Sequence, residues 1–202
     1  MLVSMIVSHL LPEDAAPQPK RWTLKEFIAL DREGHLGPTD DGERYELLDG
    51  EILTKLGQNE PHIATTRLVV AALRLAFGEG FDVNAQLPLH LGRFDAPEPD
   101  ITVLKGTARE FARRTPTGDD IALVVEVADS RLDTAIGAKV GIYAAHGIAE
   151  YWVVDLRHAT LRVFRGPRPK SRDWESVQIL EQTGSVTPLG MTEPISVADL
   201  LP

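Results

Sequence analysis

The stretch IALVVEVADSRLDTAIGAKVGIYAAHGIAEYWVVD, residues 121–155, contains two apolar segments separated by a helical pattern. The first segment, IALVVEV, is apolar at both alternating positions, which is typical of a central strand covered on both faces. It nevertheless contains Glu126, and a buried charge is costly unless a neighbouring group compensates it. The second segment, AEYWVVD, predicts another strand. We therefore interpret Glu126 as the centre of a functional site.

A lysine interrupts the apolar stripe of the helix that is predicted between these two strands. The helix is expected to begin with a capping box at Ser130 and to end at Gly147. Lys139 falls at helical spacing within the stripe. A buried ammonium needs a neighbouring carboxylate, or its pKa falls. The stripe consists of Leu132, Ala135, Ile136, Val140, Tyr143 and Ala144.

The flanking sequence predicts a mixed α/β domain. Thr23 and Glu26 form a capping-box pattern at a short helix, and RYELLDGEILTKL (44–56) reads as a hairpin around Asp49-Gly50. A helix is expected from Asn59 to Phe77, with Leu68 and Leu75 among its buried residues. Strands are expected at 83–91, from Pro99, at 159–166 and at 174–180, while 105–120 has no assignment. Strands alternate with helices in the middle of the chain and form a meander at its end, which favours a mixed sheet flanked by helices.

The composition and length of the chain limit its possible domain organisation. With 202 residues and a hydrophobic content of 43%, the chain can form one domain with a core. We assign residues 1–20 to a flexible arm and residues 21–202 to that single domain. The apolar segment MLVSMIVSHLL lacks a basic flank and is too short to span a bilayer, so it predicts neither a signal peptide nor a membrane anchor.

The chain contains no cysteine and carries a formal net charge of −9. The lack of cysteine excludes disulfides and thiolate metal sites and agrees with a cytoplasmic location. Any metal is then held by oxygen or imidazole, which favours Mg2+ or Mn2+. The negative charge argues against a protein that coats nucleic acid non-specifically.

Asp100 begins the strand that precedes Glu126 in the chain. Two carboxylates on neighbouring strands can hold a divalent cation whose shell is completed by carbonyl oxygen and water. Lys139 would then orient or deprotonate a water molecule, or stabilise charge on a phosphate. This set is the minimum for metal-assisted phosphodiester hydrolysis. The alternative is a structural ion pair between Glu126 and Lys139.

The segments PEPD (97–100), VVEVADS (124–130) and GAKVGIYAAHGIAEYWVVD (137–155) resemble the Uma-type family of endonucleases. That family belongs to the PD-(D/E)XK, restriction-endonuclease-like superfamily, and RYELLDGEI (44–52) also matches it. The resemblance implies a restriction-endonuclease-like mixed sheet, DNA as substrate, and Asp100 and Glu126 as the two motif acids. Ala128 stands where the simple motif has lysine, so the lysine is Lys139 on the following helix. Glu46 matches a further acidic position.

Three further polar residues are weaker candidates. His62, in the first turn of its helix, can bind phosphate or steer water, and the alternative is a structural residue at a helix start. Gln86 can contact substrate. Glu98 can substitute for Asp100, because the two side chains point the same way.

A basic run spans 16 positions, 157–172, that contain no acid. On alternating hairpin positions some of these residues would lie on one face and suit phosphate contact, and Arg162 and Arg165 are the candidates for nucleic-acid binding. The alternative is a charged edge that guards against aggregation. The run consists of Arg157, Arg162, Arg165, Arg168, Lys170 and Arg172.

These observations allow three alternative functions. The first is a Mg2+- or Mn2+-dependent DNA endonuclease. The second is a catalytically silent nucleic-acid-binding or assembly module of the same fold, and the apolar EYWVV segment allows a homodimer. The third is a glycosidase with Asp100 and Glu126 as acid and base. A lysine in the same pocket disfavours the glycosidase, because it would keep both carboxylates ionised.

Overall fold

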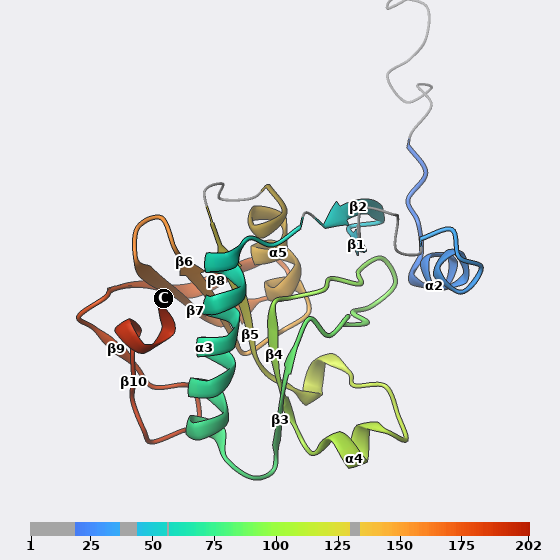
Figure 1. The fold of residues 1–202 in the computed structure, drawn as a ribbon. Coiled ribbons are helices and arrows are strands. Elements are labelled where there is room, and N and C mark those ends of the chain that lie inside the picture. Colours follow the sequence, from blue (N-terminus) through green and yellow to red (C-terminus); the bar gives the residue numbers. More distant parts are fainter. Residues whose placement is uncertain (1–18, 37–43, 56, 130–133) are drawn as a thin grey trace, which may run out of the picture.

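The computed structural model describes residues 19–36, 44–55, 57–129 and 134–202 (Figure 1). Apart from Pro19 and Lys20, the predicted N-terminal arm lies outside the described residues, and so does the expected cap at Ser130. Within the described part of the chain, no helix is long and apolar enough to cross a membrane.

A six-stranded mixed sheet forms the centre of the molecule, in the order β3-β4-β5-β6-β7-β8. All neighbouring strands are antiparallel except β5 and β6, which are parallel and are joined through α5 (Thr134–Ala145). The prediction of a mixed α/β sheet flanked by helices is therefore confirmed. The strands are β3 (Phe81–Ala85), β4 (Ile101–Lys105), β5 (Ile121–Ala128), β6 (Glu150–Asp155), β7 (Thr160–Arg168) and β8 (Asp173–Glu181).

Helices cover the two faces of the sheet (Figure 1). On one face α3 (Glu60–Phe77) packs through Val69 and Leu73, together with η3 (Val197–Leu200). The small ribbon of β9 (Ser185–Val186) and β10 (Ile195–Ser196) completes that face. On the other face Tyr143 of α5 packs on Val124 and Tyr151. The central strand β5 is thus buried on both faces, as its sequence predicts.

The hairpin of β1 (Arg44–Leu48) and β2 (Glu51–Lys55) forms a separate two-stranded sheet. Asp49 (φ 51°) and Gly50 (φ 84°) both adopt positive φ, as a type I′ turn requires, so this prediction is confirmed. Reciprocal backbone hydrogen bonds join Leu47 to Ala96. They fix the hairpin beside the segment that leads into β4. The predicted helix at the start is α2 (Leu24–Arg32), with its capping box at Thr23.

Two sequence predictions are corrected. Leu75 is 87% exposed and Leu68 is 38% exposed, because α3 buries only the face that contains Val69 and Leu73. The strand predicted at 83–91 ends at Ala85, since Gln86 takes a positive φ (55°) that breaks the ladder. Of the alternating leucines that follow, Leu89 and Leu91 are buried in the core and Leu87 is partly buried, without forming a strand. The unassigned region contains α4 (Ala108–Phe111) and η2 (Gly118–Asp120).

Candidate active site

Asp100 and Glu126 lie side by side at one end of the central sheet. Ile101 of β4 is paired with Val125 of β5, and the antiparallel register places Asp100, which precedes Ile101, opposite Glu126, which follows Val125. The backbone N–H of Val127 donates to Asp100 Oδ2 over 2.9 Å. Asp100 is 2% exposed and Glu126 is 3% exposed. The structure therefore brings together the two carboxylates that the sequence singles out.

Lys139 reaches both Glu126 and Glu46 from the buried face of α5. Its Nζ lies 3.0 Å from Glu126 Oε1 and 2.8 Å from Glu46 Oε2. Glu46 projects from β1, and its Oε2 also accepts the backbone N–H of Glu98 over 3.2 Å. The lysine thus connects α5, the central strand and the hairpin. Tyr143, one helical turn further along α5, donates its hydroxyl to Glu126 Oε1 over 3.0 Å.

Asp100 has a separate set of neighbours that surrounds its Oδ1. Lys55 Nζ lies 3.1 Å from this oxygen, Gln58 Nε2 donates to it over 3.1 Å, and His62 Nε2 lies 3.2 Å away. His62 is thus brought to the site from the first turn of α3, whose N-cap residue Asn59 accepts the His62 N–H. Lys55 and Gln58 were not identified from the sequence.

Gln86 and Glu98 lie in the next layer of the same network. Gln86 donates its amide to Gln58 over 2.8 Å and accepts from Arg44 over 3.0 Å. Arg44 also forms an ion pair with Glu98 at 2.5 Å, and Lys55 donates to the Glu98 carbonyl. The route from Gln86 to the Asp100 carboxylate therefore passes through one side chain, that of Gln58.

The electrostatics differ between the two carboxylates. Burial alone would raise the pKa of Asp100, but the His62 hydrogen bond and the Lys55 charge hold this pKa far below its ordinary value. Burial raises the pKa of Glu126 to about 7, only partly offset by Lys139, while the charge of Asp100 adds to the increase. Burial opposes the charge on Lys139, yet Glu126 and Glu46 raise its pKa above the usual range. The lysine is therefore protonated at neutral pH.

The network contains more carboxyl groups than cationic side chains. Its four carboxyl groups outnumber its three lysine and arginine side chains by one, so a divalent cation would compensate the charge of Glu126 when that group is ionised. These groups are Glu46, Glu98, Asp100 and Glu126 with Arg44, Lys55 and Lys139. An all-oxygen carboxylate pair suits a hard ion such as Mg2+.

A metal ion fits this site only if one existing contact of Asp100 is displaced. Among the described residues no group of three or more acidic or histidine side chains is already arranged to hold an ion. Mg2+ is commonly held by one or two carboxylates and keeps several waters, so a two-carboxylate site suffices. Glu126 Oε2 accepts no hydrogen bond from any residue in the described ranges, whereas Asp100 Oδ1 is occupied by Lys55. A metal at this site would have to displace the Lys55 ammonium.

A structural ion pair between Glu126 and Lys139 does not account for the whole arrangement. The pair is present, but Glu46, Asp100 and Lys55 are held against it without being needed for it. Burying each further charge carries a desolvation cost that apolar residues of similar volume would avoid. So many buried ionisable groups in one place favour a functional site.

Arg162 and Arg165 lie away from this network. Arg162 forms an ion pair with Asp155 at 3.0 Å, and Arg165 forms one with Glu150 at 2.6 Å. Their spacing of three residues along β7 places them on opposite faces of the sheet. Arg162 and Arg165 therefore do not share one face of the sheet, and their contact with nucleic acid stays a prediction. Arg172, at the end of the run, is paired with Asp49.

Comparisons with known proteins agree with this architecture. The sequence profile of the Uma2 family, which is described as "Putative restriction endonuclease", matches residues 24–197. A crystal structure described as that of "a putative nuclease belonging to DUF820" from Anabaena variabilis ATCC 29413 superposes with a TM-score of 0.64. It is 18% identical, with 88% of this chain and 96% of that chain covered, so the likeness shows a shared fold. A search of curated proteins found no match.

Proposed function

The chain belongs to the Uma2 family, and from this premise we propose that it is a divalent-metal-dependent DNA endonuclease that hydrolyses phosphodiester bonds. One observation carries the proposal. Asp100, Glu126 and Lys139 come from a loop end, a central strand and a helix, and they meet in one buried network. Two acids and a lysine around one cation form the minimum set for this reaction.

Asp100 and Glu126 would hold the cation, Mg2+ or Mn2+. When bound, such an ion polarises a phosphoryl oxygen and lowers the pKa of bound water. The ionised state of Asp100 supports this role, because the neighbouring His62 and Lys55 keep its pKa low against the effect of burial. The uncommitted Oε2 of Glu126 supplies a second oxygen within the described site.

Lys139 is proposed to stabilise negative charge, and the alternative role of general base is disfavoured. Its pKa is raised by Glu126 and Glu46, so the amine is protonated and cannot accept a proton at neutral pH. A preorganised ammonium can stabilise charge that develops on the phosphate as the bond breaks. Glu46 acts as a positioning residue, since it holds the lysine over 2.8 Å. His62 and Gln86 would orient substrate or water.

A second candidate function is a nucleic-acid-binding or assembly module that does not cut. It is favoured by one observation: both oxygens of Asp100 already accept hydrogen bonds within the chain. A network that satisfies itself can persist without a metal. This module would bind DNA in a salt-dependent manner without turnover.

Plasmid cleavage separates the two candidates. Supercoiled DNA is incubated with the purified protein in Mn2+, in Mg2+ and in EDTA, and nicked and linear forms are quantified. We expect conversion in Mn2+ that Asp100→Asn reduces at least 100-fold. Asp173→Asn, which changes an exposed aspartate at the start of β8, is the matched control and should retain activity. Plasmid that stays intact with every metal would favour the silent module.

A further inference from the structure

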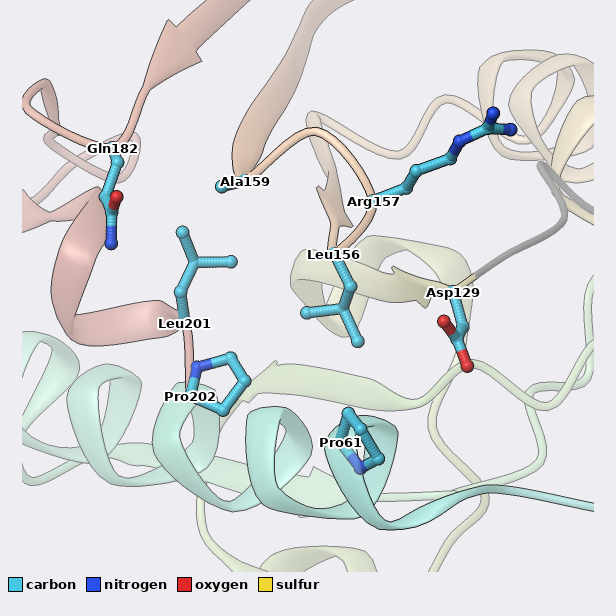
Figure 2. Close-up of a pocket in the computed structure, with 8 residues that line it drawn as sticks. All are labelled: Pro61, Asp129, Leu156, Arg157, Ala159, Gln182, Leu201 and Pro202. Atoms are coloured by element: carbon cyan, nitrogen blue, oxygen red, sulfur yellow. The ribbon is translucent and has the colours of Figure 1, made fainter.

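A hollow of ≈ 620 Å³ opens beside the N-terminus of α3, at the carboxyl ends of β5 and β6 (Figure 2). It lies on the α3 side of the sheet, because Leu156 and Ala159 in its wall pack against the same core as Val69. The lining residues are Pro61, Asp129, Leu156, Arg157, Ala159, Gln182, Leu201 and Pro202. Its volume falls within the range of sites that take a small molecule or a cofactor.

Apolar side chains form the middle of the hollow and polar groups lie around it. Figure 2 shows Leu156 and Leu201 directed toward the middle, with Pro61 below them and Gln182 on the far side from Asp129. Arg157 extends away from the middle, above Asp129 (Figure 2). Its side chain is exposed and forms no ion pair with a described residue. A few polar groups around an apolar middle can orient a flat, mostly apolar ligand.

The hollow neighbours the candidate active site at the start of α3, although none of its lining residues belongs to that site. Pro61 lines it, and the next residue, His62, contacts Asp100 at 3.2 Å. Asn59, the N-cap of α3, donates its side-chain amide to Asp129. Asp129 follows Glu126 by three residues, which corresponds to roughly 10 Å of extended chain. This distance is comparable to the reach of one nucleotide beyond a phosphate held at the site.

We propose that this hollow receives one unstacked nucleobase of the DNA strand, next to the phosphate held at Asp100 and Glu126. The proposal rests on the proposed function for its substrate. Enzymes that read an extruded base pack it between aromatic or apolar side chains and hydrogen-bond its edge. Leu156, Leu201 and Pro61 supply the apolar surfaces. The exposed Arg157 is placed to contact a phosphate of the same strand, a contact that positions the strand without reading its sequence.

The polar groups also specify which bases fit. Asp129 offers only hydrogen-bond acceptors when ionised, so it favours a base with an exocyclic amino group. Gln182 offers both a donor and an acceptor, the combination that pairs with adenine. Adenine and cytosine are therefore preferred over thymine. Because the base must leave its partner to enter, single-stranded or mismatched DNA is preferred over perfect duplex.

The test measures binding without cleavage. Fluorescence anisotropy in EDTA compares labelled 12-nucleotide strands of dA, dC and dT with an abasic strand of the same length, so that the phosphate contribution is matched. We expect dA and dC strands to bind at least fivefold tighter than dT and abasic strands. Gln182→Trp, which fills the hollow from an exposed position, should lower dA binding to the abasic value.

Two further variants keep the result interpretable. Gln178→Trp makes the same change at an exposed position of β8 that does not line the hollow, and it should bind as the unmodified chain does. Gln182→Ala removes the amide without filling the space, and it should reduce the preference for dA over dT, with the remainder supplied by Asp129. Equal binding of intact and abasic strands would overturn the proposal, and so would equal effects of the two tryptophan variants.

The plasmid assay in Mn2+ is run on the same preparations, so that the two proposals fail separately. Base-dependent binding that Gln182→Trp abolishes, without any cleavage, supports the hollow and overturns the endonuclease. Cleavage with no dependence of binding on the base supports the endonuclease and overturns the hollow. A chain that shows neither property overturns both.

Discussion

Glu126 and Lys139 depend on each other because neither charge can reach water. Lys139 is 2% exposed and holds two carboxylates, so its removal leaves Glu126 and Glu46 without a compensating charge. Breaking a buried ion pair by removing one partner typically costs about 3–5 kcal/mol. We expect Lys139→Met to lower the free energy of unfolding by about that amount, measured by urea denaturation.

Two controls accompany this prediction. Lys170→Met changes an exposed lysine and should leave the midpoint unchanged. Lys139→Met combined with Glu126→Gln should recover part of the loss, because one uncompensated charge is removed with its partner. A Lys139→Met protein as stable as the unmodified chain would show that the lysine is not compensating these acids.

Tyr143 and Tyr151 are both fully buried, yet only one hydroxyl has a partner. Tyr143 donates to Glu126 over 3.0 Å, whereas the Tyr151 hydroxyl has no hydrogen-bond partner among the described residues. A hydrogen bond to a charged group contributes about 1.5–3 kcal/mol. Tyr143→Phe is expected to lower the free energy of unfolding by about that amount. Tyr151→Phe should be neutral or stabilising, and equal losses for the two variants would contradict the assigned bond.

At the scale of elements, α3 presents one buried face and one exposed face. Leu73 is fully buried, while Leu75 is 87% exposed. Leu73→Ala should lower the free energy of unfolding by about 2–5 kcal/mol, since it removes buried methyl groups and leaves a cavity. Leu75→Ala, the same substitution two residues away, should change it by less than about 0.5 kcal/mol. Thermal or urea unfolding of the pair tests the helix orientation that brings His62 to Asp100.

Local sequence periodicity predicts the two site residues that lie on β5 and α5. The two-faced apolar pattern of β5 predicts a central strand and makes Glu126 conspicuous, and helical spacing places Lys139 on the buried face of α5. Both residues lie within one continuous segment, so short-range pattern is sufficient. Lys55 and Gln58 could not be predicted in this way. They reach Asp100 only because the hairpin docks at Ala96, a contact between residues about 50 positions apart that leaves no local pattern.

At the scale of the whole molecule, the fold pairs arginines of the 157–172 run with acidic side chains that lie outside the run. A run without acids in the chain still meets acids in space, since Arg162, Arg165 and Arg172 are paired with Asp155, Glu150 and Asp49. Tertiary pairing therefore decides which cations are available to a nucleic acid. The cytoplasmic location and the homodimer stay predictions, and the homodimer can be tested by light scattering.

A crystal structure of the chain soaked in Mn2+, with anomalous data, tests the central claim most directly. We expect an anomalous peak that contacts both Asp100 and Glu126, with the Lys55 ammonium displaced from Asp100 Oδ1 and Lys139 still held by Glu46. Absence of a peak, with Lys55 remaining within hydrogen-bond distance of Asp100, would contradict the claim.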